Sequence, residues 1–98
     1  MPIFLVTVHR SGPLWDPTLS LEQQSEWDAH ANFMDELVDQ GFVILGGPLS
    51  DDVRVVLVIE STSPEMIRDV LSHDPWSGSH LQVHSIEPWA LRLDGRAS

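Results

Sequence analysis

One histidine falls inside the apolar stripe of a predicted helix, where a titratable side chain is unusual. At 100° per residue, His30 lies between Trp27 and Met34 on the arc that carries the large apolar side chains of that helix. Histidine changes its charge near neutral pH, so it could act there as a general acid or base. It could equally be a core histidine that one hydrogen bond satisfies. The sequence leaves both interpretations open.

An aspartate extends the apolar stripe of a second predicted helix. Asp74 follows Val70 by four residues and Leu71 by three, so it lies on the same helical face. A carboxylate on an apolar face needs a hydrogen-bonding partner. If the two helices lie side by side on a sheet, Asp74 could meet His30, fix the imidazole tautomer and raise its basicity. Alternatively, Asp74 only caps the turn at Pro75.

Tryptophan is the other side chain that could shape a site, and the chain has four. Trp15 and Trp76 fall in predicted loops beside the two helices, where they could wall a pocket for a flat organic ligand. Trp27 shares the helical stripe of His30, and Trp89 falls on the last predicted strand. The simpler alternative for all four is packing, because indole side chains usually belong to a core or an interface.

The remaining histidines do not have the spacing of a metal site. His80 and His84 are four residues apart, which on a strand separates them by roughly 13 Å at about 3.3 Å per residue. The motifs HExxH and GxxxxGK and the calcium-binding loop do not occur. The run Gly46-Gly47-Pro48 is too short for a dinucleotide-binding fingerprint. We therefore expect no metal and no organic cofactor, although His73, His80 and His84 with Asp74 are the ligands that a metal would use.

Six predicted elements must position these residues, in the order strand, helix, strand, strand, helix, strand. They are Ile3–His9, a helix from about Ser20 to Gly41, Phe42–Leu45, Val53–Glu60, a helix that begins at Ser63 and ends at Pro75, and Leu81–Leu93. This order is the split β-α-β plan of the ferredoxin-like α+β fold. It predicts a four-stranded antiparallel sheet with two helices on one face, which would bring both helical stripes over the same surface.

Local signals set the expected ends of these elements. Ser20 and Gln23 have the spacing of a capping box at the start of the first helix. The run Gly46-Gly47-Pro48 is expected to close the second strand, and Ser50-Asp51-Asp52 to form the following hairpin turn. Pro88 lies near the middle of the last predicted strand, which indicates an edge position or a bulge because proline lacks a backbone N–H.

The central strands are apolar on both faces. Ile3–Val8 and Val53–Ile59 carry apolar residues in both registers. Helices cover only one face of a ferredoxin-like sheet, and a bare apolar sheet of that size is uncommon on a monomer. The sequence therefore predicts a homodimer in which a second copy covers the other face.

Composition limits the class of protein. The 98 residues suffice for one domain, with residues 94–98 expected to form a flexible tail. Fifteen acidic residues oppose five arginines, lysine is absent and the formal charge is -10, so nucleic acid and anionic membranes are poor partners. No apolar run approaches the roughly 20 residues of a membrane span. Because the sequence has no cysteine and no signal-peptide pattern, we expect the chain in the cytoplasm.

An ordered set of motifs resembles the YCII-related (YciI-like) family over nearly the whole chain. The set comprises Trp27-x-x-His30, Phe33-Met34, the helix end Leu37–Gly41, Gly46-Gly47-Pro48, Asp74-Pro75-Trp76 and Pro88-Trp89. The resemblance implies a ferredoxin-like fold in dimers of the dimeric α+β barrel type. It also implies an active site in which His30 and Asp74 form the histidine–aspartate pair. Gly47 and Pro48 would form the glycine–proline turn of the family.

The same resemblance bears on activity. Some relatives look enzymatic, including a dehydrochlorinase that acts on chlorinated hydroxyquinols. Many relatives carry an arginine one helical turn before the histidine. Trp27 occupies that place here, which weakens the expectation of an anionic substrate.

Two classes of function follow. The first is a cofactor-independent enzyme in which His30 and Asp74 move a proton on a small cyclic or aromatic molecule, in a lyase, isomerase or dehydrochlorinase-like step. The side chains expected around that molecule are Trp15, Trp27, Gly47, Pro48 and Trp76. The second class is a dimeric small-molecule-binding or interaction module without catalysis. Cofactor-independent oxygenases share the barrel plan, which makes an oxygenase a third option by fold analogy alone.

Overall fold

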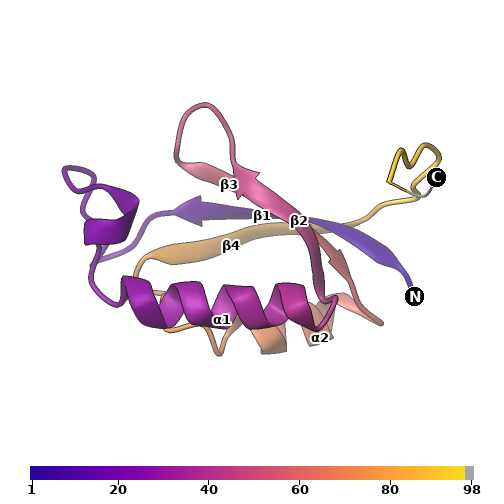
Figure 1. Ribbon diagram of the computed structural model, residues 1–98, viewed down its shortest axis with the longest axis horizontal. Coiled ribbons are helices and arrows are strands. Elements are labelled where there is room, and N and C mark those ends of the chain that lie inside the picture. Colours follow the sequence, from indigo (N-terminus) through magenta and orange to yellow (C-terminus); the bar gives the residue numbers. More distant parts are fainter. Residues whose placement is uncertain (97–98) are drawn as a thin grey trace.

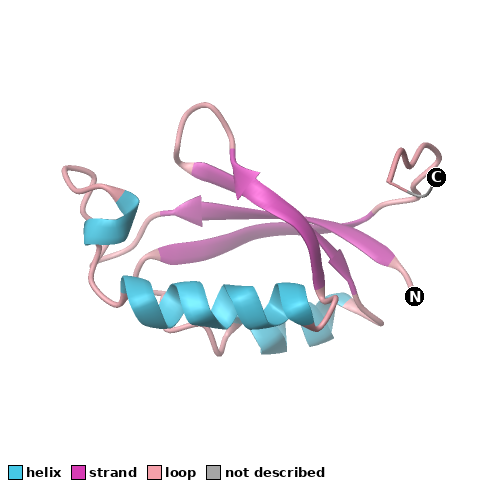
Figure 2. Ribbon diagram, in the orientation of Figure 1, coloured by secondary structure: helices cyan, strands magenta, loops and turns pink. Residues whose placement is uncertain are grey.

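A four-stranded antiparallel sheet with two helices on one face forms the frame of the protein (Figure 1, Figure 2). The computed structural model describes residues 1–96. Its elements are β1 (Ile3–Arg10), the short 3-10 helix η1 (Leu21–Gln23), α1 (Trp27–Asp39), β2 (Val43–Pro48), β3 (Arg54–Glu60), α2 (Pro64–Leu71) and β4 (Leu81–Pro88). The strand order is β2-β3-β1-β4, which confirms the ferredoxin-like α+β prediction. None of the helices within residues 1–96 has the length and apolar character needed to cross a bilayer.

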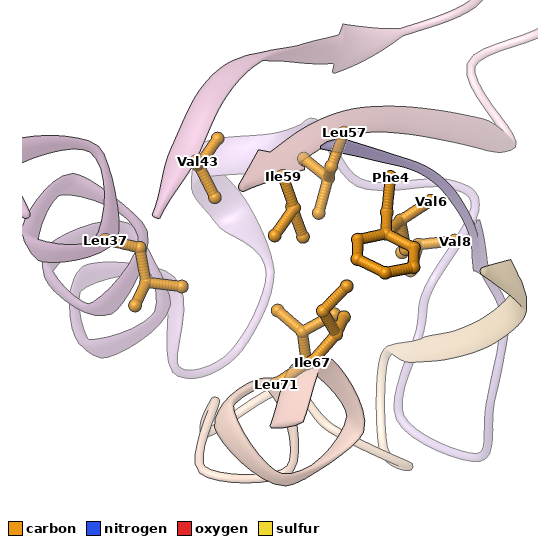
Figure 3. Packing of buried hydrophobic residues seen from close by; sticks show 9 residues of the cluster. All are labelled: Phe4, Val6, Val8, Leu37, Val43, Leu57, Ile59, Ile67 and Leu71. Atoms are coloured by element: carbon orange, nitrogen blue, oxygen red, sulfur yellow. The ribbon is translucent and has the colours of Figure 1, made fainter. Parts of the chain in front are cut away.

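The hydrophobic core lies between the sheet and the two helices (Figure 3). Every second residue of β1 points into it, so Phe4, Val6 and Val8 are buried. Antiparallel pairing sets Leu57 of β3 opposite Val6 and Ile59 opposite Phe4, which continues the same apolar surface. The helices add Leu37 from α1 and Ile67 and Leu71 from α2. Burial of each such side chain stabilises the fold by about 1.5–3 kcal/mol, and it fixes both helices over one side of the sheet.

The first long helix begins later than the sequence signals predict. Ser20 and Gln23 make the expected contact, with the Ser20 N–H donating to Gln23 Oε1 at 3.0 Å, but this contact closes only η1. The buried amide of Gln24 then binds the preceding loop, accepting from the N–H of Asp16 and donating to its carbonyl oxygen. Glu26 has a left-handed φ of 63°, which redirects the chain before α1. The helix is interrupted because the Gln24 side chain bonds to the loop.

The glycine–proline run expected to end the second strand is instead part of it. β2 continues through Gly46-Gly47-Pro48 in register with β3. Gly46 lies opposite Leu57, and a Cβ atom there would come within 2.6 Å of the Leu57 Cδ2 atom. That glycine therefore permits a close approach of side chain and backbone rather than a turn. Pro48 is tolerated because β2 is an edge strand.

The hairpin turn forms beyond this run, where Ser50-Asp51-Asp52 predicts it. The Asp52 N–H donates to the carbonyl oxygen of Leu49 at 3.0 Å. Asp51 Oδ1 accepts from the backbone N–H groups of Arg54 and Val53, and these two bonds hold the pKa of Asp51 well below its ordinary value. The ionised Asp51 carboxylate thus stabilises the turn by accepting these two backbone hydrogen bonds.

The last strand is shorter than predicted. β4 ends at Pro88 rather than at Leu93, and the N–H of Trp89 makes one further bond to the carbonyl oxygen of Ile3. Because β1 begins at Ile3, residues 90–96 have no neighbouring strand with which to pair. The edge position expected from Pro88 is confirmed, whereas the bulge lies further back, opposite the middle of β1.

The expected tail, residues 94–98, extends past the described part of the chain. Within it, Arg96 Nη2 lies 2.7 Å from Asp94 Oδ2. Residues 97–98 lie outside the described residues. The flexibility of this segment stays a prediction.

Neither α1 nor α2 covers the second face of the sheet (Figure 1). Leu5, Val56 and Val58 are half-buried on this face by alternation with the core residues, and the nearby Leu45 is 55% exposed. His9 lies on the same face and stacks on His84, with the ring centroids 4.3 Å apart. The face is therefore partly apolar and open, and the predicted homodimer would use it.

Candidate active site

A cavity of about 160 Å³ lies between the helices and the sheet. Its walls are mostly apolar and include Trp27, Met34, Leu57, Leu71, Trp76 and Val83. The polar part of the lining consists of Arg10, His30, Asp74 and Ser77. An engineered cavity of about 150 Å³ in another protein holds benzene. One ring with small substituents is therefore the size of molecule that this cavity accepts.

His30 and Asp74 meet in the wall of the cavity, as the sequence predicts, although α2 ends at Leu71 and not at Pro75, so that Asp74 lies in the turn after the helix. The Nδ1 atom of His30 lies 2.9 Å from both Oδ1 and Oδ2 of Asp74. Their side chains are 12% and 5% exposed, so the pair is largely shielded from water. An ionised Asp74 can only accept, so Nδ1 carries the proton and Nε2 of the neutral ring is unprotonated. Nε2 makes no hydrogen bond within residues 1–96, and His30 is one of the residues that line the cavity.

The Asp74 carboxylate also closes the turn that follows α2. Its Oδ1 atom accepts from the backbone N–H of Trp76 at 2.9 Å. The carbonyl oxygen of Asp74 accepts from the N–H of Ser77, also at 2.9 Å. The two alternatives from the sequence, a partner for His30 and a cap for the turn, are therefore both realised by one side chain. Because the turn fixes the carboxylate, it can fix the orientation of the imidazole.

Trp76 is held between two histidine rings. His30 stacks on one face with ring centroids 4.0 Å apart and an interplanar angle of 3°. His80 stacks on the indole with centroids 4.7 Å apart and an angle of 12°. The indole is 1% exposed, and its Nε1–H donates to the carbonyl oxygen of Ser25 at 2.8 Å. Trp76 is therefore a buried ring against which both imidazoles pack.

His80 differs from His30 because both of its nitrogens are engaged. Its Nε2 atom lies 3.0 Å from the hydroxyl of Ser25, and its Nδ1 atom lies 2.8 Å from the hydroxyl of Ser79. The residue is fully buried. Burial lowers the pKa of His80, and the neighbouring His30 lowers it further. His80 is therefore a neutral anchor for the indole rather than a group that exchanges protons with the cavity.

Of the other residues predicted to surround a ligand, two line the cavity and three do not. Trp27 and Trp76 both line the cavity, with ring centroids 5.8 Å apart. Trp15 does not line it but packs edge-on against Trp76 at 6.0 Å and 77°, so it supports the wall from outside. Gly47 and Pro48 belong to the edge strand β2 and are not among the lining residues. This cavity therefore gives no support to their predicted contact with a ligand.

Three residues at or beside the cavity were not predicted from the sequence to belong to the site. The predicted first strand ends at His9, yet Arg10 is the last residue of β1 and lines the cavity. Its position two residues after Val8, on the same strand face, is the signal that could have revealed it. His80 is expected only as a possible metal ligand. Ser25, which binds both His80 and Trp76, has no distinguishing signal in the sequence.

The histidines considered as metal ligands are dispersed in the structure. His80 uses both ring nitrogens on serine hydroxyls, and Nδ1 of His73 bonds to the carbonyl oxygen of Asp69 at 2.8 Å. His84 lies on the opposite face of the sheet, stacked on His9. Within residues 1–96, no three His, Asp or Glu side chains are placed to hold a metal ion together.

The arrangement can hold one proton on His30 and exchange it with a small molecule beside Nε2. Asp74 supplies the orientation and the compensating charge, and Trp76 supplies a flat apolar support. The side chains of His30 and Asp74 are largely buried, which strengthens the polar interaction between them. Comparisons with family models, with curated proteins and with solved structures found no match for this chain.

Proposed function

We propose that the protein is a cofactor-independent acid/base enzyme in which His30 moves a proton on a small cyclic or aromatic molecule. The observation that carries this proposal is the 2.9 Å bond from His30 Nδ1 to Asp74 beside a cavity of single-ring size. It engages one imidazole nitrogen with a carboxylate and leaves the other nitrogen to the cavity. The resemblance of the sequence to the YCII-related family, with its histidine–aspartate active site, supports the same assignment.

In the proposed step, Nε2 of His30 removes a proton from a carbon or hydroxyl group of the bound molecule. The bond to hydrogen breaks, and its electron pair stays on the substrate. In an elimination, this pair forms a double bond while a leaving group such as chloride departs with its own bonding pair. In an isomerisation, Nε2–H returns the proton to a different atom. Asp74 orients the ring and stabilises the imidazolium that forms, and a positioned general base typically accelerates such a step by ~10²–10⁴-fold.

Proton exchange tests the proposal before the natural substrate is known. A thermal-shift screen of single-ring cyclic and aromatic compounds, chlorinated hydroxyquinols included, identifies binders. Each binder is then incubated with the protein in D₂O, and NMR follows deuterium incorporation or elimination. We expect the wild type to catalyse either deuterium incorporation into a binder or elimination from it, and His30→Gln to do so at least ~100-fold more slowly. His84→Gln, on the opposite sheet face, is the matched control and should leave the rate unchanged.

The same cavity also supports a second candidate, a small-molecule-binding module without catalysis. The observation in its favour is the lining, which is mostly apolar and needs no chemistry to bind a ring. The exchange experiment separates the two candidates. Binders that show no exchange or turnover, or whose exchange is unchanged in His30→Gln, would support the binding module and refute the enzyme.

We also propose that the protein works as a homodimer in the cytoplasm. The open sheet face with Leu5, Val56 and Val58 supports the dimer, since a second copy would cover these side chains. The absence of cysteine from the sequence supports the compartment. Light scattering at low micromolar concentration should give twice the mass of one chain, and Val58→Asp should reduce it to the mass of one chain. A wild-type mass equal to one chain would contradict the dimer.

A further inference from the structure

One arginine reaches the cavity from the end of a central strand. Arg10 is the last residue of β1 and shares the strand face of Val6 and Val8, which point toward the helices. It is half-buried and lines the same cavity as His30. Among the residues described, it is the one arginine that does so.

The guanidinium of Arg10 has no carboxylate partner within residues 1–96, although the chain has fifteen acidic residues. Its Nη1 atom donates to the carbonyl oxygen of Asp52 at 3.1 Å, and its Cζ atom lies 5.6 Å from the centroid of the Trp15 ring. Arg54 makes the contrasting case, since it pairs with Asp51 at 2.7 Å. A guanidinium has five N–H donors arranged as a fork that matches a carboxylate. Arg10 therefore keeps donors for an anion in the cavity.

The charges in the cavity lining select among possible ligands. Asp74 is the one carboxylate among the described lining residues, and it is already bound to His30 and to the N–H of Trp76. An organic cation would therefore find no free carboxylate there and would be repelled by Arg10. A ligand with several negative charges is also disfavoured, because one guanidinium faces it and the whole chain carries a formal charge of -10.

We infer that the cavity binds a single-ring organic monoanion, such as an aromatic or cyclic carboxylate, with its charged group on Arg10 and its ring against Trp27 and Met34. The inference rests on the proposed function, since the same cavity holds the reacting molecule. In this pose Arg10 binds the substrate and fixes its orientation, while His30 acts on another part of the ring. The cavity volume of about 160 Å³ limits the ligand to one ring.

Three matched probes test the charge requirement directly. Benzoate, its neutral analogue benzamide and the cation benzylamine are titrated into the intact protein by calorimetry. NMR follows the indole N–H signals of Trp27 and Trp76 to locate the ligand. We expect benzoate to bind about tenfold or more tightly than benzamide, the range of a charge-assisted hydrogen bond, and to shift both indole signals. Benzylamine should not bind in the cavity.

Arginine variants separate recognition of the anion from a structural role. Arg10→Gln should remove the preference for benzoate and leave the affinity for benzamide unchanged. Arg10→Lys should retain part of the preference, because it keeps the charge but not the fork. Arg54→Gln is the control, since Arg54 is exposed and already paired with Asp51.

Three other results of these titrations would each contradict a specific part of the inference. Equal affinities for benzoate and benzamide, with the indole signals shifted, would overturn the anion and leave the ring-binding cavity of the proposed function intact. An equal loss of both ligands in Arg10→Gln would show that Arg10 only holds the hairpin turn through Asp52. The absence of any binding, with the signals of Trp27 and Trp76 unchanged, would overturn the inference and the ring-binding cavity together.

Discussion

Two histidines stack on the Trp76 ring, and their hydrogen bonds differ. His30 binds Asp74 through Nδ1 and leaves Nε2 to the cavity, whereas His80 binds Ser25 and Ser79 through both nitrogens. Their distances to the indole are similar, 4.0 and 4.7 Å between ring centroids. Both histidines therefore stack on Trp76, but only His30 has a ring nitrogen, Nε2, without a hydrogen-bond partner among the described residues.

The difference assigns separate tasks to the two histidines. A histidine with both nitrogens bonded and a lowered pKa stays neutral and adds rigidity. A histidine with a carboxylate on one nitrogen and a cavity at the other can exchange a proton with a ligand. Trp76 joins the two, because the ring that His80 supports is the ring on which His30 rests. Substitutions at these three residues should therefore have separable effects.

The largest effect is expected from removal of the shared ring. Trp76→Ala deletes an indole that is 1% exposed and should lower the free energy of unfolding by about 3–5 kcal/mol. Trp89→Ala, at a tryptophan that is 44% exposed, is the control and should cost less than about 1 kcal/mol. Urea denaturation measures both. If the two variants lost equal stability, Trp76 could not be the support of the site. Trp76→Phe keeps an aromatic ring and serves if Trp76→Ala does not fold.

A matched pair of glutamine variants should separate chemistry from stability. His30→Gln removes the free imidazole nitrogen, while the glutamine amide can still donate to Asp74, so binding of ring compounds should persist and proton exchange should be lost. His80→Gln loses the stack on Trp76 and one of two serine bonds, and it should lower the free energy of unfolding by about 1–2 kcal/mol without changing the exchange rate. Denaturation and the D₂O assay on the same samples give both readouts. A rate loss in His80→Gln as large as that in His30→Gln would contradict the separation.

The smallest expected effect is on how the stability of the protein depends on pH. The folded protein lowers the pKa of His80 below its ordinary value of about 6.5. The unfolded chain therefore binds a proton at His80 that the folded chain does not, so this residue reduces stability as the pH falls through about 6.5. Melting temperatures between pH 7.5 and 5.5 should decrease less steeply in His80→Gln than in the wild type. Equal slopes would show that His80 does not titrate differently in the two states.

The fold and the pairing of His30 with Asp74 could be predicted, because both depend on patterns within short stretches of the sequence. Helical periodicity places His30 on the apolar stripe of α1, and the element order implies that both helices face one sheet surface. The predicted second helix is too long, because α2 ends at Leu71 and Asp74 lies in the turn that follows it. The hydrogen bond between the two residues nevertheless agrees with the sequence prediction. The same patterns mark β1 and β3 as apolar on both faces, but they do not indicate which face packs against the helices; the structure buries Phe4, Val6 and Val8 of β1 there.

The features that the sequence did not reveal depend on contacts between distant segments. The glycine run indicates a turn by composition, but packing of Leu57 against Gly46 keeps the run within β2. The capping signal at Ser20 is met, yet Gln24 bonds to a loop eight residues earlier and delays α1. The position of Arg10 was also not predicted, because its place in the cavity depends on β1 being one residue longer than the predicted strand Ile3–His9.

The central claim is that His30 presents an unprotonated Nε2 to the cavity while Asp74 holds the proton on Nδ1. Long-range ¹H–¹⁵N correlation spectra of the labelled protein, at a pH where the ring is neutral, report which nitrogen carries the proton. We expect the Nδ1–H tautomer in the wild type and a shift toward the Nε2–H tautomer in Asp74→Asn, whose amide can donate to Nδ1. A wild-type His30 protonated at Nε2, with no change in Asp74→Asn, would contradict the account.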